Sequence, residues 1–266
     1  MKLPVVEVLR ETYEGFFRHG RAMMRLVRYA ALAYVALIIL QAAYSLGLEF
    51  YYHYYEIRTL ALLGYGIILL PWLIFPLFAV PWSRYIILGE RNAGWRGYYR
   101  RYLLATVVVS LPGILLIAGT VFGLIVMDGA DRTAGVLSVG IFLFFLLVTL
   151  YLQVRLSLLL PLTAVRGGLL IKEAWAMTGG NCGRLCLATA GAILPVSVVF
   201  YLVFSLVFVL MFTVLGSAEG EAGLLLPVLF ILLFFVVSLA SFLLVTLLFI
   251  SVLSVSYRHL SVRPAT

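Results

Sequence analysis

The chain contains apolar runs that are too long and too free of charge for the interior of a soluble domain. No ionised residue occurs from Thr59 to Trp82, and none occurs from Leu224 to Tyr257. About 20 mainly apolar residues are enough for a helix to cross the hydrocarbon core of a membrane. Hydrophobic residues make up 64% of the sequence and charged residues 11%, whereas soluble domains are roughly 45–50% apolar and about 25% charged. Lipid is therefore the expected solvent for most of this chain.

Six segments have the length and composition of a membrane-spanning helix. These predicted spans are residues 26–47, 59–81, 102–127, 135–160, 185–215 and 224–256. We predict an all-α, polytopic integral membrane protein that forms a single membrane domain over residues 1–266. An N-terminal amphipathic helix occupies 1–25, a six-span bundle 26–256, and a cytoplasmic tail 257–266. The acidic residues Glu7, Glu11 and Glu14 precede the first span, which is therefore expected to be a retained anchor.

Lys and Arg are concentrated in alternate connections between the spans, and this asymmetry predicts the topology. Of the 19 Lys and Arg residues, only Arg58 and Arg132 lie outside the N-terminal region, the 82–101 and 155–184 connections and the C-terminal tail. We therefore expect both termini in the cytoplasm, with the basic connections facing anionic lipid headgroups. This placement explains the net charge of +8 without a nucleic-acid partner. Arg far outnumbers Lys, which is typical of high-GC bacterial genomes, so the expected location is a bacterial inner membrane.

Two of the predicted spans begin with matching sequences. RYLLATVVVSLP (101–112) and RLCLATAGAILP (184–195) share Arg, Leu, Ala, Thr, Leu and Pro in register. Each Pro lies ~16 Å into its helix, near the bilayer midplane. Since an amphipathic stretch precedes both spans and also the first one, we predict three repeated units. Each unit consists of a cytoplasmic interfacial helix followed by two spans.

The amphipathic stretches carry polar residues at the bends into the membrane. The N-terminal stretch has an apolar stripe formed by Val5, Val8, Leu9, Thr12, Tyr13 and Phe16. In the 165–184 region the shared helical face is formed by Ile171, Ala174, Trp175 and Thr178. Gly179 and Gly180 are expected to end that helix, and Asn181 to cap the next one. Before the third span, Trp95, Tyr98 and Tyr102 recur at helical spacing.

Seven residues at these bends are candidate contacts for lipid or for a partner protein. They are Arg84, Glu90, Arg155, Glu173, Trp175, Asn181 and Arg184. We expect Arg155 and Arg184 to pair with Glu173 or with lipid phosphates. A membrane-protein partner or a second copy of the chain is a further expectation.

Prolines and buried amides mark the places where a cavity is expected. Pro71, Pro76 and Pro81 all fall in the predicted second span, and each removes a backbone hydrogen bond. In lipid the freed carbonyls must be covered by protein or water, so this span either packs inside the bundle or lines a cavity. The strongest buried polar groups in the spans are Gln41 and Gln153.

The sequence shows none of the residue clusters that carry common enzyme or transport chemistry. No carboxylate or Lys lies deep in a predicted span, and the three His residues are far apart. Cys182 and Cys186 are i, i+4 neighbours without a further ligand, which favours a packing face over a metal site. We therefore expect no cofactor, no metal and no enzymatic activity.

Two segments resemble a known group of membrane proteins. PWSRYIILGER (81–91) and VRLSLLLPLTAVRGGLLIKEAWAMTGGNCGRL (154–185) are similar to segments of uncharacterised six-span bacterial inner-membrane proteins. These are akin to the membrane-domain family of glycerophosphoryl diester phosphodiesterases. The resemblance covers most of the chain and implies the six-span fold and its topology.

Two functions fit these features. The first is a non-enzymatic membrane scaffold, accessory subunit or envelope-maintenance factor that contacts anionic lipid. The alternative is a carrier or flippase for a lipid or another amphipathic molecule. A polar pocket between the second, third and fifth spans would favour transport, whereas a dry, packed centre would favour the scaffold.

Overall fold

The structure is a computed structural model that describes residues 2–25, 28, 32–33, 35–37, 39, 58–89, 97–127, 132–217 and 225–261. All regular elements in these ranges are helices, which confirms the all-α prediction for the described part of the chain. They are α1 (Val5–Arg18), α3 (Arg58–Leu88), α4 (Tyr99–Met127), α5 (Arg132–Ser157), α6 (Leu159–Arg166), α7 (Ile171–Thr178), α8 (Cys182–Ser217) and α9 (Leu225–Ser261).

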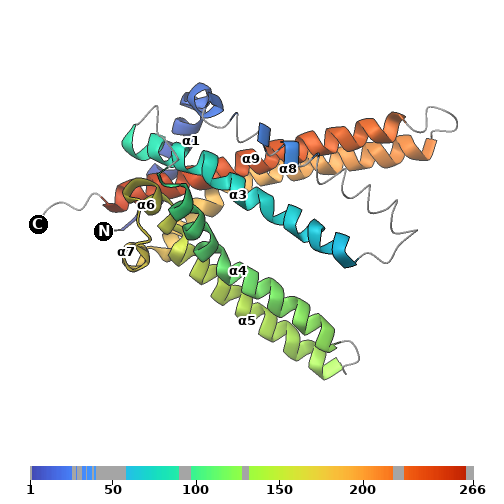
Figure 1. Ribbon diagram of the computed structural model, residues 1–266, viewed down its shortest axis with the longest axis horizontal. Helices are drawn as coiled ribbons and strands as arrows, with labels where there is room; N and C mark the ends of the chain where they lie inside the picture. The colour runs from blue at the N-terminus through green and yellow to red at the C-terminus, as the bar shows by residue number, and fades with distance from the viewer. Residues whose placement is uncertain are drawn as a thin grey trace, which may run out of the picture.

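Two long helical hairpins diverge from one end of the molecule (Figure 1). Helices α4 and α5 pack together as one hairpin, and α8 and α9 pack as the other. Helix α3 extends between the two hairpins and contacts both α4 and α9. We call the shared end the base: it contains α1, α6, α7, the first turns of α4 and α8, and the last turns of α3, α5 and α9.

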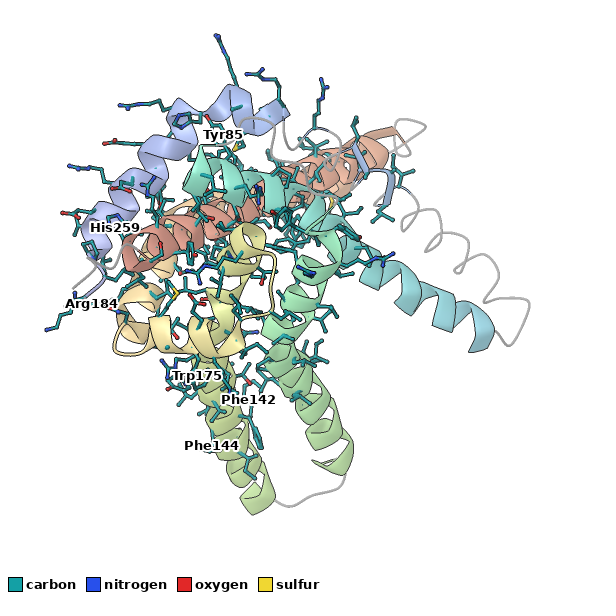
Figure 2. All side chains as sticks on the ribbon, turned by 60° about the vertical axis from the view of Figure 1, so that its left-hand side comes forward. Tyr85, Phe142, Phe144, Trp175, Arg184 and His259 are labelled. Carbon is teal, nitrogen blue, oxygen red and sulfur yellow. The ribbon has the colours of Figure 1, made fainter. Side chains whose placement is uncertain are left out.

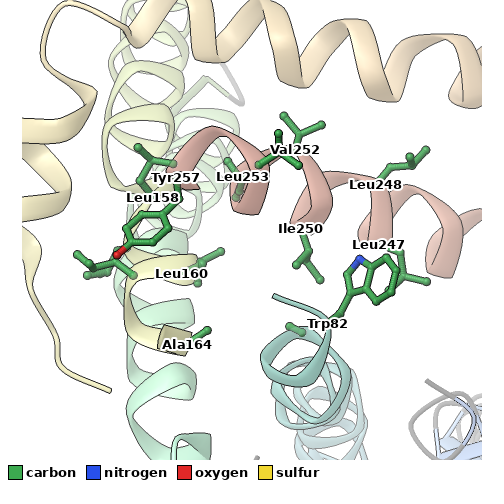
Figure 3. Packing of buried hydrophobic residues seen from close by; sticks show 14 of the residues in the cluster. Trp82, Leu158, Leu160, Ala164, Leu247, Leu248, Ile250, Val252, Leu253 and Tyr257 are labelled. Atoms are coloured by element: carbon green, nitrogen blue, oxygen red, sulfur yellow. The ribbon is translucent and has the colours of Figure 1, made fainter. Parts of the chain in front are cut away.

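The buried core is concentrated at the base. The segment from Leu158 to Ala164 is buried throughout, and α6 packs against α3, α4 and α9. Figure 3 shows Leu158 and Leu160 facing residues of α9, with Trp82 of α3 beneath the same helix. The indole Nε1 of Trp82 donates a hydrogen bond of 2.8 Å to Ser251 Oγ in α9, so this buried polar group is satisfied.

The hairpins expose large apolar side chains along their length. Phe144 on α5 is 62% exposed and Tyr201 on α8 is 71% exposed, and Figure 2 shows Phe142 and Phe144 on the arm below the base. Four helical segments of the described chain are long and apolar enough to cross a membrane: Tyr99–Ile117, Val139–Arg166, Cys182–Met211 and Val236–Ser261. The exposed apolar faces and these four segments identify the chain as a membrane protein.

The two remaining predicted spans have different outcomes. Most of 26–47 lies outside the described residues. The span at 59–81 falls within α3, which runs as one helix through all three of its prolines, and its described apolar part, Leu73–Leu88, is shorter than a full crossing. The predicted fourth span at 135–160 is divided between two helices, since α5 ends at Ser157 and α6 begins at Leu159 after a turn at Leu158.

The amphipathic N-terminal stretch forms the helix α1, whose apolar stripe is covered by protein. Val8, Thr12 and Phe16 are buried, and α1 packs on α8 and α9. Phe17, on a neighbouring face, is 77% exposed. The predicted stripe of α1 is therefore a packing face, and Phe17 lies on an exposed part of α1.

The other amphipathic stretches agree only in part with their predicted form. Helix α7 ends at Thr178 and is capped by Gly179, as expected, but its predicted face is divided. Thr178 is buried, whereas Trp175 is 37% exposed. Before the third span, Trp95 lies outside the described residues, and Tyr102 belongs to α4 itself.

Candidate functional site

Arginine side chains hold the base together by donating hydrogen bonds to backbone carbonyls. Arg84 Nη1 donates to the carbonyl of Ala164 (3.1 Å) and its guanidinium lies 4.4 Å from the ring centroid of Tyr98. Arg101 Nη1 donates to the carbonyl of Gly167. These carbonyls lie at the end of α6, where a helix has no donors of its own to satisfy them. The two arginines therefore fasten the end of α6 to α3 and α4.

The start of α8 binds the N-terminal residues in the same way. Arg184 Nη1 donates to the carbonyl of Leu3 (3.1 Å), and the backbone N–H of Leu3 donates to Asn181 Oδ1 (2.8 Å). Asn181 directly precedes α8, as predicted, and is buried. Arg101 and Arg184, which match in the two aligned segments, thus both donate to a backbone carbonyl that is distant in sequence, although Gly167 follows Arg101 in the chain and Leu3 precedes Arg184.

The predicted pairing of Arg155 or Arg184 with Glu173 is wrong. Glu173 is paired with Arg166, the last residue of α6, at 2.5 Å. Arg155 instead lies 4.3 Å from the ring centroid of Trp175 and donates to the carbonyl of that residue (3.1 Å). Sequence spacing did not show that α6 would end next to the first turn of α7. Glu90 lies outside the described residues, and lipid contact by the other six nominated residues stays a prediction.

Tyr13 covers a gap in the hydrogen bonding of α8. Pro195 has no N–H, so the carbonyl of Gly191 loses its helical donor. The hydroxyl of Tyr13 lies 3.3 Å from that carbonyl oxygen and donates to the neighbouring carbonyl of Ala192 at 2.8 Å. Burial raises the pKa of Tyr13, so the hydroxyl keeps its proton. Packing of α1 is thereby linked to the kink of α8.

A cavity of about 760 Å³ lies where the two hairpins diverge from the base. Its wall is formed mainly by α4, α5, α8 and α9, with Phe75 from α3 and Leu160 from α6. Two of its lining residues, Leu160 and Leu185, belong to the buried core of the base. From Cys186 to Leu194 the lining of α8 extends over ~12 Å. This size is within the roughly 300–1,000 Å³ of small-molecule sites.

The cavity wall is mostly apolar, with a few neutral polar groups. None of the described residues that line it is ionisable as Asp, Glu, Lys, Arg or His. The hydroxyls of Thr106 and Ser110 donate to carbonyls of their own helix at 2.9 Å and 2.8 Å. The side chains of Gln153, Thr189 and Thr246 also line the cavity. Within the described part of the chain these three have no hydrogen-bond partner.

The two hairpins present corresponding positions to the cavity. Thr106 and Thr189, which match in the aligned segments, both line it. On α5 the lining residues are Leu150, Gln153, Val154 and Ser157, and on α9 they are Phe242, Val245, Thr246 and Phe249. Both sets follow the i, i+3, i+4, i+7 spacing of one helical face. The cavity is therefore built from two similar faces.

Sequence reasoning found part of this cavity. The third and fifth predicted spans line it, as expected, and Gln153 had been singled out as a buried amide. The second span contributes Phe75 alone, and the fourth and sixth spans contribute more than predicted. Ser157 and Thr246 were missed, although their spacing on α5 and α9 carried a weak signal. Comparison with protein families, characterised proteins and solved structures found no match to this chain.

Proposed function

We propose that this protein is a bacterial inner-membrane carrier or flippase that binds a lipid between its two hairpins. The single observation that carries the proposal is the cavity of about 760 Å³ at the divergence of α4–α5 from α8–α9. The pocket expected for transport was polar and lay between the second, third and fifth spans, whereas this cavity is mostly apolar and is formed mainly by the third to sixth spans. An apolar wall suits the acyl chains of a lipid better than a polar substrate. Burying one methylene group in such a site is worth ≈ 0.8 kcal/mol relative to water. A lipid that enters from the membrane gains less, so shape and polar contacts must decide which lipid binds.

The charge asymmetry supports an orientation with the base in the cytoplasm. The basic connections all belong to the base side of the proposed six-span topology, which supports a cytoplasmic location for both termini. The cavity then lies in the inner-leaflet half of the membrane. The basic members of the nominated set, Arg84, Arg155 and Arg184, would contact anionic headgroups at the base. Trp175, which is 37% exposed, would lie in the interface. Glu90, Glu173 and Asn181 are proposed contacts for a partner protein. The proposed architecture still consists of three repeated units, each formed by an interfacial helix and two spans.

A transfer assay tests the proposal. The purified protein is reconstituted into vesicles that contain fluorescent lipids of several headgroup types, and the rate of exchange between leaflets is measured. We expect protein-dependent exchange of at least one lipid. Ala190→Trp places a large side chain in the cavity and should reduce the rate at least tenfold. Val199→Trp, on the exposed face of α8, is the matched control and should keep it.

No protein-dependent exchange across the panel would contradict the carrier function. Lipid exchange that persists in Ala190→Trp would show that the lipid does not cross the membrane through this cavity.

A scaffold or accessory subunit is the second candidate function. It is favoured by the extensive exposed apolar surface of α8, where Tyr201, Leu202 and Phe208 are all more than half exposed, because such a face suits a second membrane protein as well as lipid. Recovery of a stoichiometric partner from native membranes would support this function. Recovery of the chain alone would count against it.

A further inference from the structure

We propose that the cavity selects an uncharged lipid that carries a carbonyl or hydroxyl group, which binds at Gln153. The inference rests on the proposed function, since it names the class of lipid that the cavity takes. It is drawn from the three neutral polar side chains of the wall and from the absence of ionisable groups among its described residues.

Gln153 is the strongest polar group in the wall. Its side chain lies against α4, since a methyl group added at Gly113 would be 2.8 Å from Gln153 Nε2. The amide has two donors and one acceptor site. No described residue satisfies them. Gln153 is half-buried, and an amide that loses contact with water without gaining a partner destabilises the protein. A ligand with a carbonyl oxygen or a hydroxyl removes that cost.

Two threonines extend the polar site across the cavity. Thr189 on α8 and Thr246 on α9 line the same space as Gln153 on α5, and neither hydroxyl has a partner in the described chain. Three neutral groups from three helices therefore face one apolar space. Together they suit a small polar centre with apolar chains on either side, such as a glycerol esterified twice.

A charged headgroup does not suit this cavity. Transfer of an ionised group into an apolar site without a partner is far more costly than transfer of a neutral one. Among the described residues, the wall offers no cation or anion as a partner. Leu160 and Leu185, which line the cavity, are themselves buried. The arginines of the base also donate to backbone carbonyls, as for Arg84, Arg101, Arg155 and Arg184.

Equilibrium binding in nanodiscs or detergent tests this selectivity. The probes are diacylglycerol and phosphatidic acid with the same fluorescent acyl chain, which differ only in the phosphate. We expect diacylglycerol to bind at least tenfold more tightly. Gln153→Leu removes the amide at similar volume and should weaken diacylglycerol binding about fivefold, since one hydrogen bond is worth ≈ 1 kcal/mol. Thr189→Val should weaken it by a similar or smaller factor.

Thr120→Val and Gly119→Ala are controls for a general disturbance of the fold, and Gly113→Ala is a second test of the contact with Gln153. Thr120→Val removes a hydroxyl that bonds only within α4, to the carbonyl of Leu116, and should leave binding unchanged. Gly113→Ala displaces the amide of Gln153 without removing it and should weaken diacylglycerol binding. Gly119→Ala meets nothing within 4 Å and should have no effect.

The outcomes distinguish this inference from the function on which it rests. Equal or tighter binding of phosphatidic acid, or unchanged diacylglycerol binding by Gln153→Leu, would overturn the selectivity and leave the carrier function in place. No binding of either probe, together with no lipid exchange in vesicles, would overturn both.

Discussion

Tyr13 illustrates how single residues of this chain satisfy backbone groups that prolines leave open. Its hydroxyl donates to the carbonyl of Ala192, next to the carbonyl that Pro195 frees. Tyr99 makes a comparable bond to α3, where its hydroxyl donates at 2.7 Å to the carbonyl of Leu73, the neighbour of the carbonyl of Trp72 that Pro76 leaves without its helical donor. In lipid an unsatisfied carbonyl costs several kcal/mol. Tyrosine meets this need because its ring is apolar and its tip is a donor.

Tyr13→Phe is therefore expected to destabilise the protein by about 1 kcal/mol, the typical net contribution of one hydrogen bond. Thermal unfolding in detergent micelles measures the change. Hydrogen exchange should also be faster in α1, because the hydroxyl links α1 to α8. Tyr201→Phe removes a hydroxyl from the exposed face of α8 and should have no effect. Equal stability of Tyr13→Phe and wild type would show that water satisfies the carbonyl.

At this scale the sequence identified which residues are polar, but not which atoms they bind. Arg84, Arg155 and Arg184 were predicted at the bends because charged residues are rare in this chain. Their acceptors are backbone carbonyls of segments distant in sequence, including Leu3 for Arg184. Charge counting predicts the side of the membrane on which an arginine lies. Charge counting does not show which backbone carbonyl, at the end of a neighbouring helix, the arginine binds.

Among the elements, α6 and the connection that follows it organise the base. The segment from Leu158 to Ala164 is buried on all sides, and α6 ends at Gly167 in the left-handed conformation (φ 69°). A β-carbon at Gly167 would lie 3.0 Å from the ring of Tyr98. Gly180, after α7, is also left-handed (φ 72°) but has nothing within 4 Å. Both glycines adopt the left-handed backbone conformation, but only Gly167 is packed closely against another side chain.

Substitution of each glycine by alanine separates these two effects. Gly180→Ala should cost roughly 1–2 kcal/mol, the usual penalty of the left-handed conformation for a residue with a β-carbon. Gly167→Ala should cost more, because the new methyl group displaces Tyr98 and disturbs the contact of that ring with Arg84. Chemical unfolding in detergent measures both. Equal losses for the two variants would contradict the close packing of Tyr98 on this connection.

The sequence predicted which long apolar segments form helices, but it did not predict where such a segment is divided into two helices. Long apolar runs predicted α4, α5, α8 and α9 within a few residues at most of their ends. The division of the predicted span 135–160 into α5 and α6 was missed, although Pro161 gave a signal for it. Pro161 has no N–H to donate to the carbonyl of Ser157, the last residue of α5. Helix α6 then packs against α3, α4 and α9.

At the scale of the whole molecule, a tight base carries two divergent arms. The largest buried side chains, such as Trp82, Tyr102 and Phe78, are at or near the base. The arms have few long-range contacts other than those within each hairpin, and Figure 1 shows their separation. Apolar patterning predicted the crossings. It did not predict the divergence, since residues that face lipid and residues that face an apolar cavity are chemically alike.

The proposed topology places the hairpin tips and the base on opposite sides of the membrane. In a variant with Cys182 and Cys186 replaced, single cysteines are introduced at Arg132, where α5 begins, and at Lys172 in α7. A membrane-impermeant thiol reagent added to intact cells from outside should label the first and not the second. Permeabilisation should expose the second. Labelling of both from outside would contradict the topology.

The central claim is that the space between the two hairpins is a lipid site within the membrane. Cryo-electron microscopy of the protein in nanodiscs made from its native membrane, with a rigid antibody fragment as a marker, tests this claim most directly. The account predicts α4–α5 and α8–α9 diverging from the base, with elongated density between them that touches Gln153 and Thr189. Hairpins closed against each other, with their own side chains filling that space, would contradict it.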